Sequence, residues 1–294
     1  MNSIVTARLL SGQHEALGRS WFYDFREVPQ FCVSTNVKKH IESLSARYAG
    51  ITKHWDIDRN SEWICRIYLS AKMIMFATLQ LQALEYARQQ NLRVVAPYLE
   101  YYSILSVIRS VVYTLPEVEW MNGDLVKIPH RKAINLVFDH LAFFNKPKAA
   151  EMKGLTFDLK SNREIISYRS PSSGDKGLLE VIDVVSFATL LAEFTQLNSE
   201  LLERSIHKNA DESSFVFRED YAEKLTSVTI DDRNFFDKED YYRVGYLMRK
   251  YPLPPNVLHI MTEGHVEDFF GAWSSENGDG FDPDANWRLI FDIP

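Results

Sequence analysis

Hydrophobic residues recur every three or four positions along several long segments of this chain, which is the spacing of one face of an α-helix. Residues 61–90 keep this spacing without a glycine or proline, so they predict one long helix. Residues 97–113 start at a proline, stop before Pro116 and are apolar around most of the helix circumference, which predicts a helix at the centre of the fold. Residues 178–207 predict a further long amphipathic helix.

Shorter segments between these helices also have helical composition and are bounded by turn-forming residues. We expect helices at residues 37–48 and 129–144, and one or two short helices within residues 149–168, broken at Gly154. The Ser- and Gly-rich residues 170–177 predict a loop. Long helices joined by short links predict a mainly α fold, an up-and-down helical bundle.

The pattern divides the chain into three regions. Residues 1–36 predict short extended segments, and residues 37–208 predict the helical bundle. Residues 209–294 form an acidic, aromatic-rich extension with helices expected at 237–251 and 256–270. Because aromatic side chains favour burial, we expect this extension to fold back onto another part of the chain.

Composition narrows the class of protein. With 46% hydrophobic and 25% charged residues, the 294-residue chain has the composition of a soluble globular protein, and no run of about 18 apolar residues lacks a charge. We therefore expect a cytoplasmic protein with no membrane partner. Cys32 and Cys65 are too few for a disulfide framework or a cysteine-based zinc site. The sequence also has no zinc-hydrolase, dinucleotide-binding or serine-hydrolase motif, so we expect no metal and no cofactor.

Charge is distributed unevenly along the chain, which carries a net −7. Residues 208–294 have 9 Lys plus Arg against 18 Asp plus Glu, whereas residues 1–207 are nearly neutral. The acidic C-terminal third repels phosphates, so we do not expect the protein to coat DNA in general. The nearly neutral remainder still allows a local basic patch that binds RNA or a nucleotide.

Two motifs stand out within and after the predicted central helix. Tyr101 and Tyr102 are adjacent, and Arg109 follows seven residues after the second tyrosine. His130 opens the next predicted helix, and Phe138 follows eight residues later.

A third motif consists of Arg163, Glu164 and Tyr168, with Ser167 before the tyrosine. In this order, the three motifs resemble those of the HEPN superfamily, small helical bundles of bacterial toxin, defence and nucleotidyltransferase-partner proteins; that family usually has Asp where Ser167 stands. The resemblance covers roughly residues 61–208. It implies a HEPN-like bundle and a nucleotide- or RNA-associated role in a prokaryotic toxin or antiviral defence system, with a protein partner or a homodimer.

The candidate ligand-binding residues are Tyr101, Arg109, Tyr168 and Arg169. A guanidinium inside an otherwise apolar helix must be paired or face a polar site, which applies to Arg109. Arg169 lies beside a polar turn suited to phosphate oxygens. The same residues also fit a structural role, in which the tyrosines pack and the arginines bind carbonyl groups or carboxylates.

The candidate catalytic residues are His130 and Arg163. A neutral imidazole at a helix start can act as an acid or base near pH 7, or simply cap the helix. The resemblance leads us to expect that Arg109, His130 and Arg163 line one polar cleft.

Catalytic HEPN ribonucleases usually carry Arg, four to six residues, then His, and need no metal. This chain matches at Arg8 with His14 and at Arg47 with His54, no more often than chance gives, and neither pair lies on the expected final helices of the bundle. Enzymatic activity is therefore left open. The sequence is compatible with three classes of function: the nucleotide- or RNA-associated defence component, a non-catalytic dimerising or scaffold protein of the same fold, and a metal-independent ribonuclease.

Overall fold

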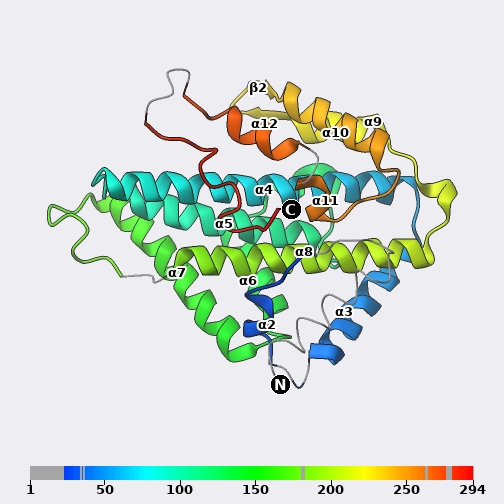
Figure 1. The fold of residues 1–294 in the computed structure, drawn as a ribbon, viewed down its shortest axis with the longest axis horizontal. Coiled ribbons are helices and arrows are strands. Elements are labelled where there is room, and N and C mark those ends of the chain that lie inside the picture. The colour runs from blue at the N-terminus through cyan, green and yellow to red at the C-terminus, as the bar shows by residue number, and fades with distance from the viewer. Residues whose placement is uncertain are drawn as a thin grey trace.

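A computed structural model describes residues 23–33, 35, 37–179, 183–261, 264–275 and 280–293. The fold is a mainly α helical bundle, which confirms the predicted class. Three long helices lie side by side at its centre: α4 (Ile57–Gln89), α5 (Ala96–Thr114) and α8 (Val184–Asn209) (Figure 1).

The two predicted central helices form as single uninterrupted elements. Asp56 caps α4, because its side chain accepts a hydrogen bond from the Arg59 backbone N–H at 2.8 Å. Pro97 lies in the first turn of α5, where its missing N–H costs no helical hydrogen bond. Helix α5 is buried along most of its length, which fits its apolar circumference.

Helix α8 begins six residues later than expected. The backbone N–H and C=O of Leu179 bind the Asn162 side chain at 3.1 and 2.8 Å, so this part of the chain is held outside a helix. Asp183 then adopts a left-handed conformation and caps α8 through the Ser186 N–H. The predicted start at residue 178 is therefore wrong.

Further helices cover the sides of the central layer: α2 (Val28–Phe31), α3 (Val37–Thr52), η1 (Met121–Lys127), α6 (His130–Leu141) and α7 (Lys146–Arg169). Helix α7 runs straight through Gly154, so the expected break is wrong. A glycine inside a helix costs only about 1 kcal/mol relative to alanine, and buried residues such as Leu159 hold the helix against the bundle. Residues 23–27 lack regular structure, but Val28–Phe31 are helical rather than extended; residues 1–22 lie outside the described residues.

The C-terminal region contains an unexpected hairpin. Its elements are η2 (Glu212–Ser214), α9 (Glu219–Thr226), β1 (Ser227–Ile230), β2 (Arg233–Phe236), α10 (Lys238–Lys250), α11 (Val257–Met261) and α12 (His265–Gly271). The antiparallel strands are joined by Asp231 and Asp232, which both have positive φ angles, as a tight hairpin turn requires. The predicted helix at 237–251 forms as α10, whereas the one expected at 256–270 is divided into α11 and α12, the second of which starts after Gly264 with φ +75°.

One hydrophobic core joins the N-terminal segment, the bundle and the C-terminal region. Tyr23 contacts Phe291 with ring centroids 4.6 Å apart, so segments near both ends of the chain meet on the bundle. Helices α9 to α12 pack against α4, and α3 packs against α8 at an angle (Figure 1). The expectation that the aromatic-rich extension folds back onto the chain is therefore confirmed.

Helix α4 is long and apolar enough to cross a membrane by length and composition alone. However, 78% of its most apolar window is buried inside the protein, as in the core helix of a soluble protein. A cytoplasmic location stays a prediction.

A buried arginine fixes α5 against α4. Arg66 on α4 is 1% exposed and donates to the carbonyl oxygens of Tyr113, Leu115 and Val118 at 2.7 to 2.8 Å, and to the Glu62 carboxylate at 2.9 Å. The last carbonyl groups of a helix have no partner within the helix, so Arg66 completes the end of α5.

We expect Arg66→Met to lower the free energy of unfolding by about 3 to 5 kcal/mol, because it leaves three carbonyls and a carboxylate without their cation. The matched control is Arg88→Met on the same helix. Arg88 is 52% exposed and pairs with Glu100 near the surface, so its loss should cost less than about 1 kcal/mol. Urea unfolding followed by circular dichroism measures both values, and equal costs for the two variants would contradict the role of Arg66.

Two buried ionisable groups give the fold opposite responses to pH. Burial lowers the pKa of His140 from its ordinary 6.5 to about 3, so His140 favours folding above pH 6.5 and destabilises the protein as the pH falls toward 3. Burial raises the pKa of Glu193 from 4.5 to about 7, although its carboxylate accepts three backbone N–H bonds from residues 26–28. Glu193 therefore favours folding most below pH 4.5, and this contribution is lost as the pH rises to 7.

We expect His140→Phe to gain about 2 kcal/mol of stability relative to the wild type when the pH is lowered from 7.5 to 5, because the buried imidazole no longer resists protonation. Comparing each variant with itself at two pH values removes any constant cost of repacking against Phe144 and Phe194. Urea unfolding at both pH values measures the difference. The control is His207→Phe at an exposed position of α8, which should respond to pH like the wild type.

Candidate functional site

Helices α5, α6 and α7 bring together a tyrosine, a histidine and an arginine. The hydroxyl of Tyr101 and Nδ1 of His130 form a hydrogen bond of 2.8 Å, in which either atom can be the donor. The Arg163 guanidinium lies over the Tyr101 ring at 5.4 Å and the Tyr102 ring at 5.9 Å. Together with Arg109, these residues make up what we call the Tyr101–His130 cluster.

The two arginines of this cluster have unused donors. Nε of Arg109 and Nε of Arg163 are buried, and neither has a hydrogen-bond partner among the described residues. Nη2 of Arg163 is 3.4 Å from the Glu164 carboxylate, which is also 2.8 Å from Nζ of Lys160. A buried donor without a partner is costly, so these two guanidinium groups are suited to an added acceptor.

Burial, modified by the nearby arginines, determines the protonation of the Tyr–His pair. Burial lowers the pKa of His130, and the positive charges of Arg109, Arg163 and Lys160 lower it further. Burial raises the pKa of Tyr101 to about 12, against the opposing effect of the same arginines. At neutral pH the cluster therefore holds a neutral imidazole and a protonated phenol beside positive charges.

Local structure explains why these residues meet. Tyr101 lies in the second turn of α5, and His130 is the first residue of α6, directly after Pro129. The His130 imidazole bonds to Tyr101 rather than capping its own helix. Arg163 reaches the cluster because α7 continues past Gly154 and packs against both α5 and α6.

The structure places the other two candidate residues farther out. The Tyr168 side chain is 74% exposed, with its ring 6.0 Å from the Arg163 guanidinium. Arg169 is exposed at the end of α7, where Ser170 adopts a positive φ and terminates the helix. Ser167, which stands where the family usually has Asp, bonds to the Arg163 carbonyl and to the Tyr98 hydroxyl. Because residue 167 is a serine, it supplies no negative charge to neutralise the nearby arginines.

The sequence motifs did not identify Lys160 as a residue near the Tyr101–His130 cluster. Lys160 lies one helical turn before Glu164, and its charge acts on His130. The four-residue spacing between Lys160 and Glu164 is the signal that would have predicted their ion pair.

The two formal Arg–His matches do not form a described site. Arg47 pairs with the Glu117 carboxylate and lies 5.6 Å from the Phe143 ring, which gives it a structural role. His54 is exposed in the turn after α3. Arg8 and His14 lie outside the described residues.

Metal and thiol chemistry find no support in the described part of the chain. No group of three His, Cys, Asp or Glu side chains there could hold a metal ion. Cys32 and Cys65 are buried free thiols, and burial raises the pKa of each, to about 12 for Cys32.

No protein-family model, no curated protein and no solved structure matches this chain.

Proposed function

We propose that this chain is a HEPN-like, nucleotide- or RNA-associated component of a prokaryotic toxin or antiviral defence system. The observation that carries the proposal is the pair of buried, unpartnered guanidinium donors on Arg109 and Arg163, beside the Tyr101–His130 hydrogen bond. The order of the sequence motifs supports the family assignment, and the helical bundle is compatible with it.

The charges of the cluster favour a phosphate. Arg109, Arg163 and Lys160 place three positive charges near His130, and the Glu164 carboxylate pairs with Lys160 and Arg163. Guanidinium groups donate forked hydrogen bonds that match phosphate oxygens, so a bound phosphate would satisfy the unused donors.

An exposed aromatic ring beside the arginines adds a second element of recognition. Tyr168 is 74% exposed and close to Arg163, so its ring is available to stack on a nucleobase. Arg169 is exposed next to it and supplies a further positive charge. A phosphate site beside a stacking surface favours a single-stranded RNA or a nucleotide over duplex DNA.

We expect Arg163→Gln and Arg109→Gln each to weaken binding of a labelled single-stranded RNA about tenfold, because each removes a charge-assisted hydrogen bond to phosphate. Each variant should also reduce the slope of log affinity against log salt by about 1. Fluorescence anisotropy at several salt concentrations measures both effects.

The matched control for this experiment is Arg249→Gln, at an exposed position of α10 that does not belong to the cluster. It should bind RNA like the wild type. Thermal melting shows that the variants are folded. Equal affinities for all three variants would contradict the proposed phosphate site, and a wild type that binds neither RNA nor nucleotide but elutes as a dimer would favour the scaffold alternative.

The metal-independent ribonuclease is the second candidate, and the Tyr101–His130 pair is the observation that favours it. A neutral imidazole can accept a proton from an RNA 2′-hydroxyl while an arginine stabilises the charge on the phosphate. Because the pKa of His130 is lowered, the imidazole stays neutral to a lower pH than an ordinary histidine.

We expect cleavage of labelled single-stranded RNA with chelator present to fall at least about 100-fold in His130→Ala, because the proton acceptor is removed. His54→Ala should cleave like the wild type, since His54 is exposed in the turn after α3 and is not part of the cluster. The wild type should stay active at pH 6. Loss of activity in a folded His54 variant would instead favour the Arg47–His54 pair.

A further inference from the structure

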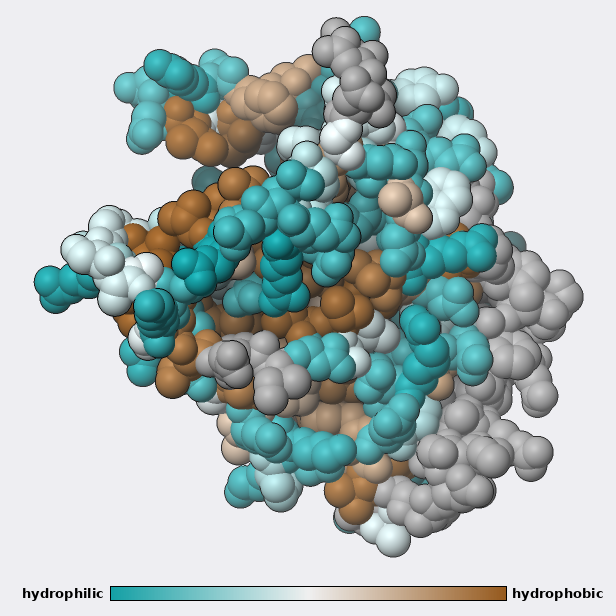
Figure 2. Space-filling view, turned by 60° about the vertical axis from the view of Figure 1, so that its left-hand side comes forward, coloured by the Kyte–Doolittle hydropathy of each residue, from teal (hydrophilic) through white to brown (hydrophobic). Residues whose placement is uncertain are grey.

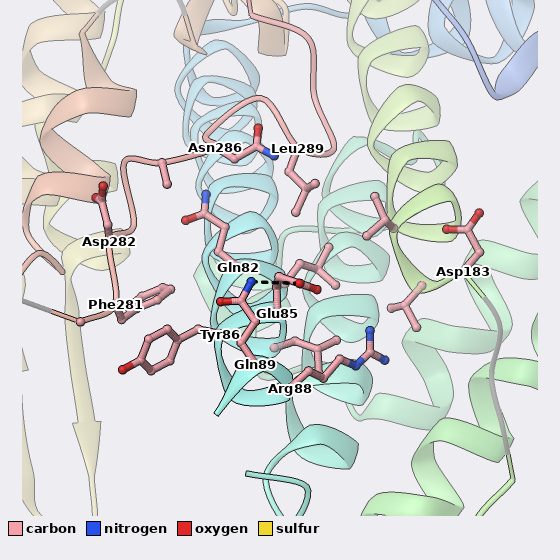
Figure 3. A pocket seen from close by; sticks show the side chains of 16 residues that line it. Gln82, Glu85, Tyr86, Arg88, Gln89, Asp183, Phe281, Asp282, Asn286 and Leu289 are labelled. Carbon is pink, nitrogen blue, oxygen red and sulfur yellow. Dashed lines mark hydrogen bonds between the residues drawn. The ribbon is translucent and has the colours of Figure 1, made fainter. Parts of the chain in front are cut away.

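A second site lies at the C-terminal end of α4, built from parts of the chain far apart in sequence. Its walls are the last turns of α4, the first turn of α8 and the tail segment 280–289, which enclose a pocket of about 550 Å³ (Figure 3). The face of the molecule toward this end of α4 shows hydrophobic surface in hollows between hydrophilic ridges (Figure 2). The volume is that of a pocket for a small organic molecule.

The walls of the pocket combine apolar side chains with polar and charged ones. Leu81 and Leu84 come from α4, Val184 from α8 and Leu289 from the tail. The Tyr86 and Phe281 rings contact each other with centroids 5.8 Å apart and form an aromatic part of the wall. The apolar and aromatic part of the wall suits a flat ring.

Gln82 is the unexplained polar group in this pocket. Its side chain is 8% exposed, and both its amide nitrogen and its amide oxygen are buried without a hydrogen-bond partner among the described residues. In Figure 3 the amide lies on the side of α4 that faces the tail, near Phe281 and Asn286. Burying an amide without partners costs free energy, so the arrangement indicates a missing donor–acceptor pair.

The charges around the pocket select against anions. Glu85, Asp183 and Asp282 contribute three carboxylates, whereas Arg88 is the one cationic residue among the described residues of the wall and already pairs with Glu100 at 2.7 Å. A phosphate at this position would meet repulsion. The pocket therefore differs in character from the Tyr101–His130 cluster, where cations prevail.

We propose that this pocket binds an uncharged heteroaromatic molecule whose edge carries an N–H donor next to a carbonyl acceptor, paired with the Gln82 amide. The Gln82 oxygen accepts from the ligand N–H, and the Gln82 NH₂ group donates to the ligand carbonyl. A pyrimidine base such as uracil and a pyridine carboxamide such as nicotinamide both present this edge. The inference is independent of the phosphate site proposed above.

Isothermal titration of the full chain with uracil, nicotinamide and uridine 5′-monophosphate tests the proposal. We expect saturable binding of one uracil or one nicotinamide per chain. The compound that binds more tightly shows whether the pocket prefers a pyrimidine base or a pyridine carboxamide. The monophosphate should bind more weakly than uracil because the acidic side chains repel its phosphate. Failure of both neutral probes to saturate at millimolar concentration would overturn the proposal.

We expect Gln82→Leu to weaken binding about 10- to 100-fold, because leucine keeps the size of the side chain but removes both hydrogen bonds. The same variant should melt at a higher temperature than the wild type without ligand, since the unpartnered amide is gone. The matched control is Gln80→Leu on the same helix; Gln80 accepts from Ser106 outside the pocket, so affinity should not change. A folded Gln82→Leu protein that binds like the wild type would overturn the assignment.

Discussion

The buried Arg66 guanidinium is the interaction on which the rest of the structure depends. It reaches from α4 to the end of α5 and the loop that follows, where it donates to three carbonyl oxygens, and its guanidinium stacks 3.7 Å from the centroid of the Trp63 ring. A desolvated arginine is tolerated only when its donors are satisfied, so α5 must end where Arg66 can reach its carbonyl groups. This requirement fixes the position of α5 along α4.

Fixing α5 in turn fixes the Tyr101–His130 cluster, because Tyr101 and Arg109 lie on that helix. Other buried polar groups place the remaining segments by the same logic. Glu193 on α8 accepts the backbone N–H groups of residues 26–28 at the start of α2, and Gln196 on α8 accepts the Leu258 N–H of α11. In each case a side chain of the bundle binds backbone groups of the attached segment that have no partner within its own helix.

The sequence predicted those elements whose cause is local. The apolar spacing of α4 and α5 and the absence of breakers determine both helices, and the motif order pointed to Tyr101, His130 and Arg163, which the fold brings together. The late start of α8 depends on Leu179 binding Asn162, a tertiary contact that no local pattern records. The hairpin turn uses two aspartates where glycine or asparagine is the usual signal. The pocket could not be predicted, since its walls come together only after folding.

Among the buried polar groups, those without partners distinguish the two proposed sites. Arg66 and Glu193 have their donors or acceptors met within the chain, which is what a structural role requires. The cationic Nε–H groups of Arg109 and Arg163 have no hydrogen-bond partner among the described residues, so these groups favour an anionic ligand. The amide donor and acceptor of Gln82 have no hydrogen-bond partner among the described residues and lie near acidic side chains, so they favour an uncharged ligand. The chemistry of the unmet groups therefore separates a phosphate-binding surface from a pocket for a neutral ring within one bundle.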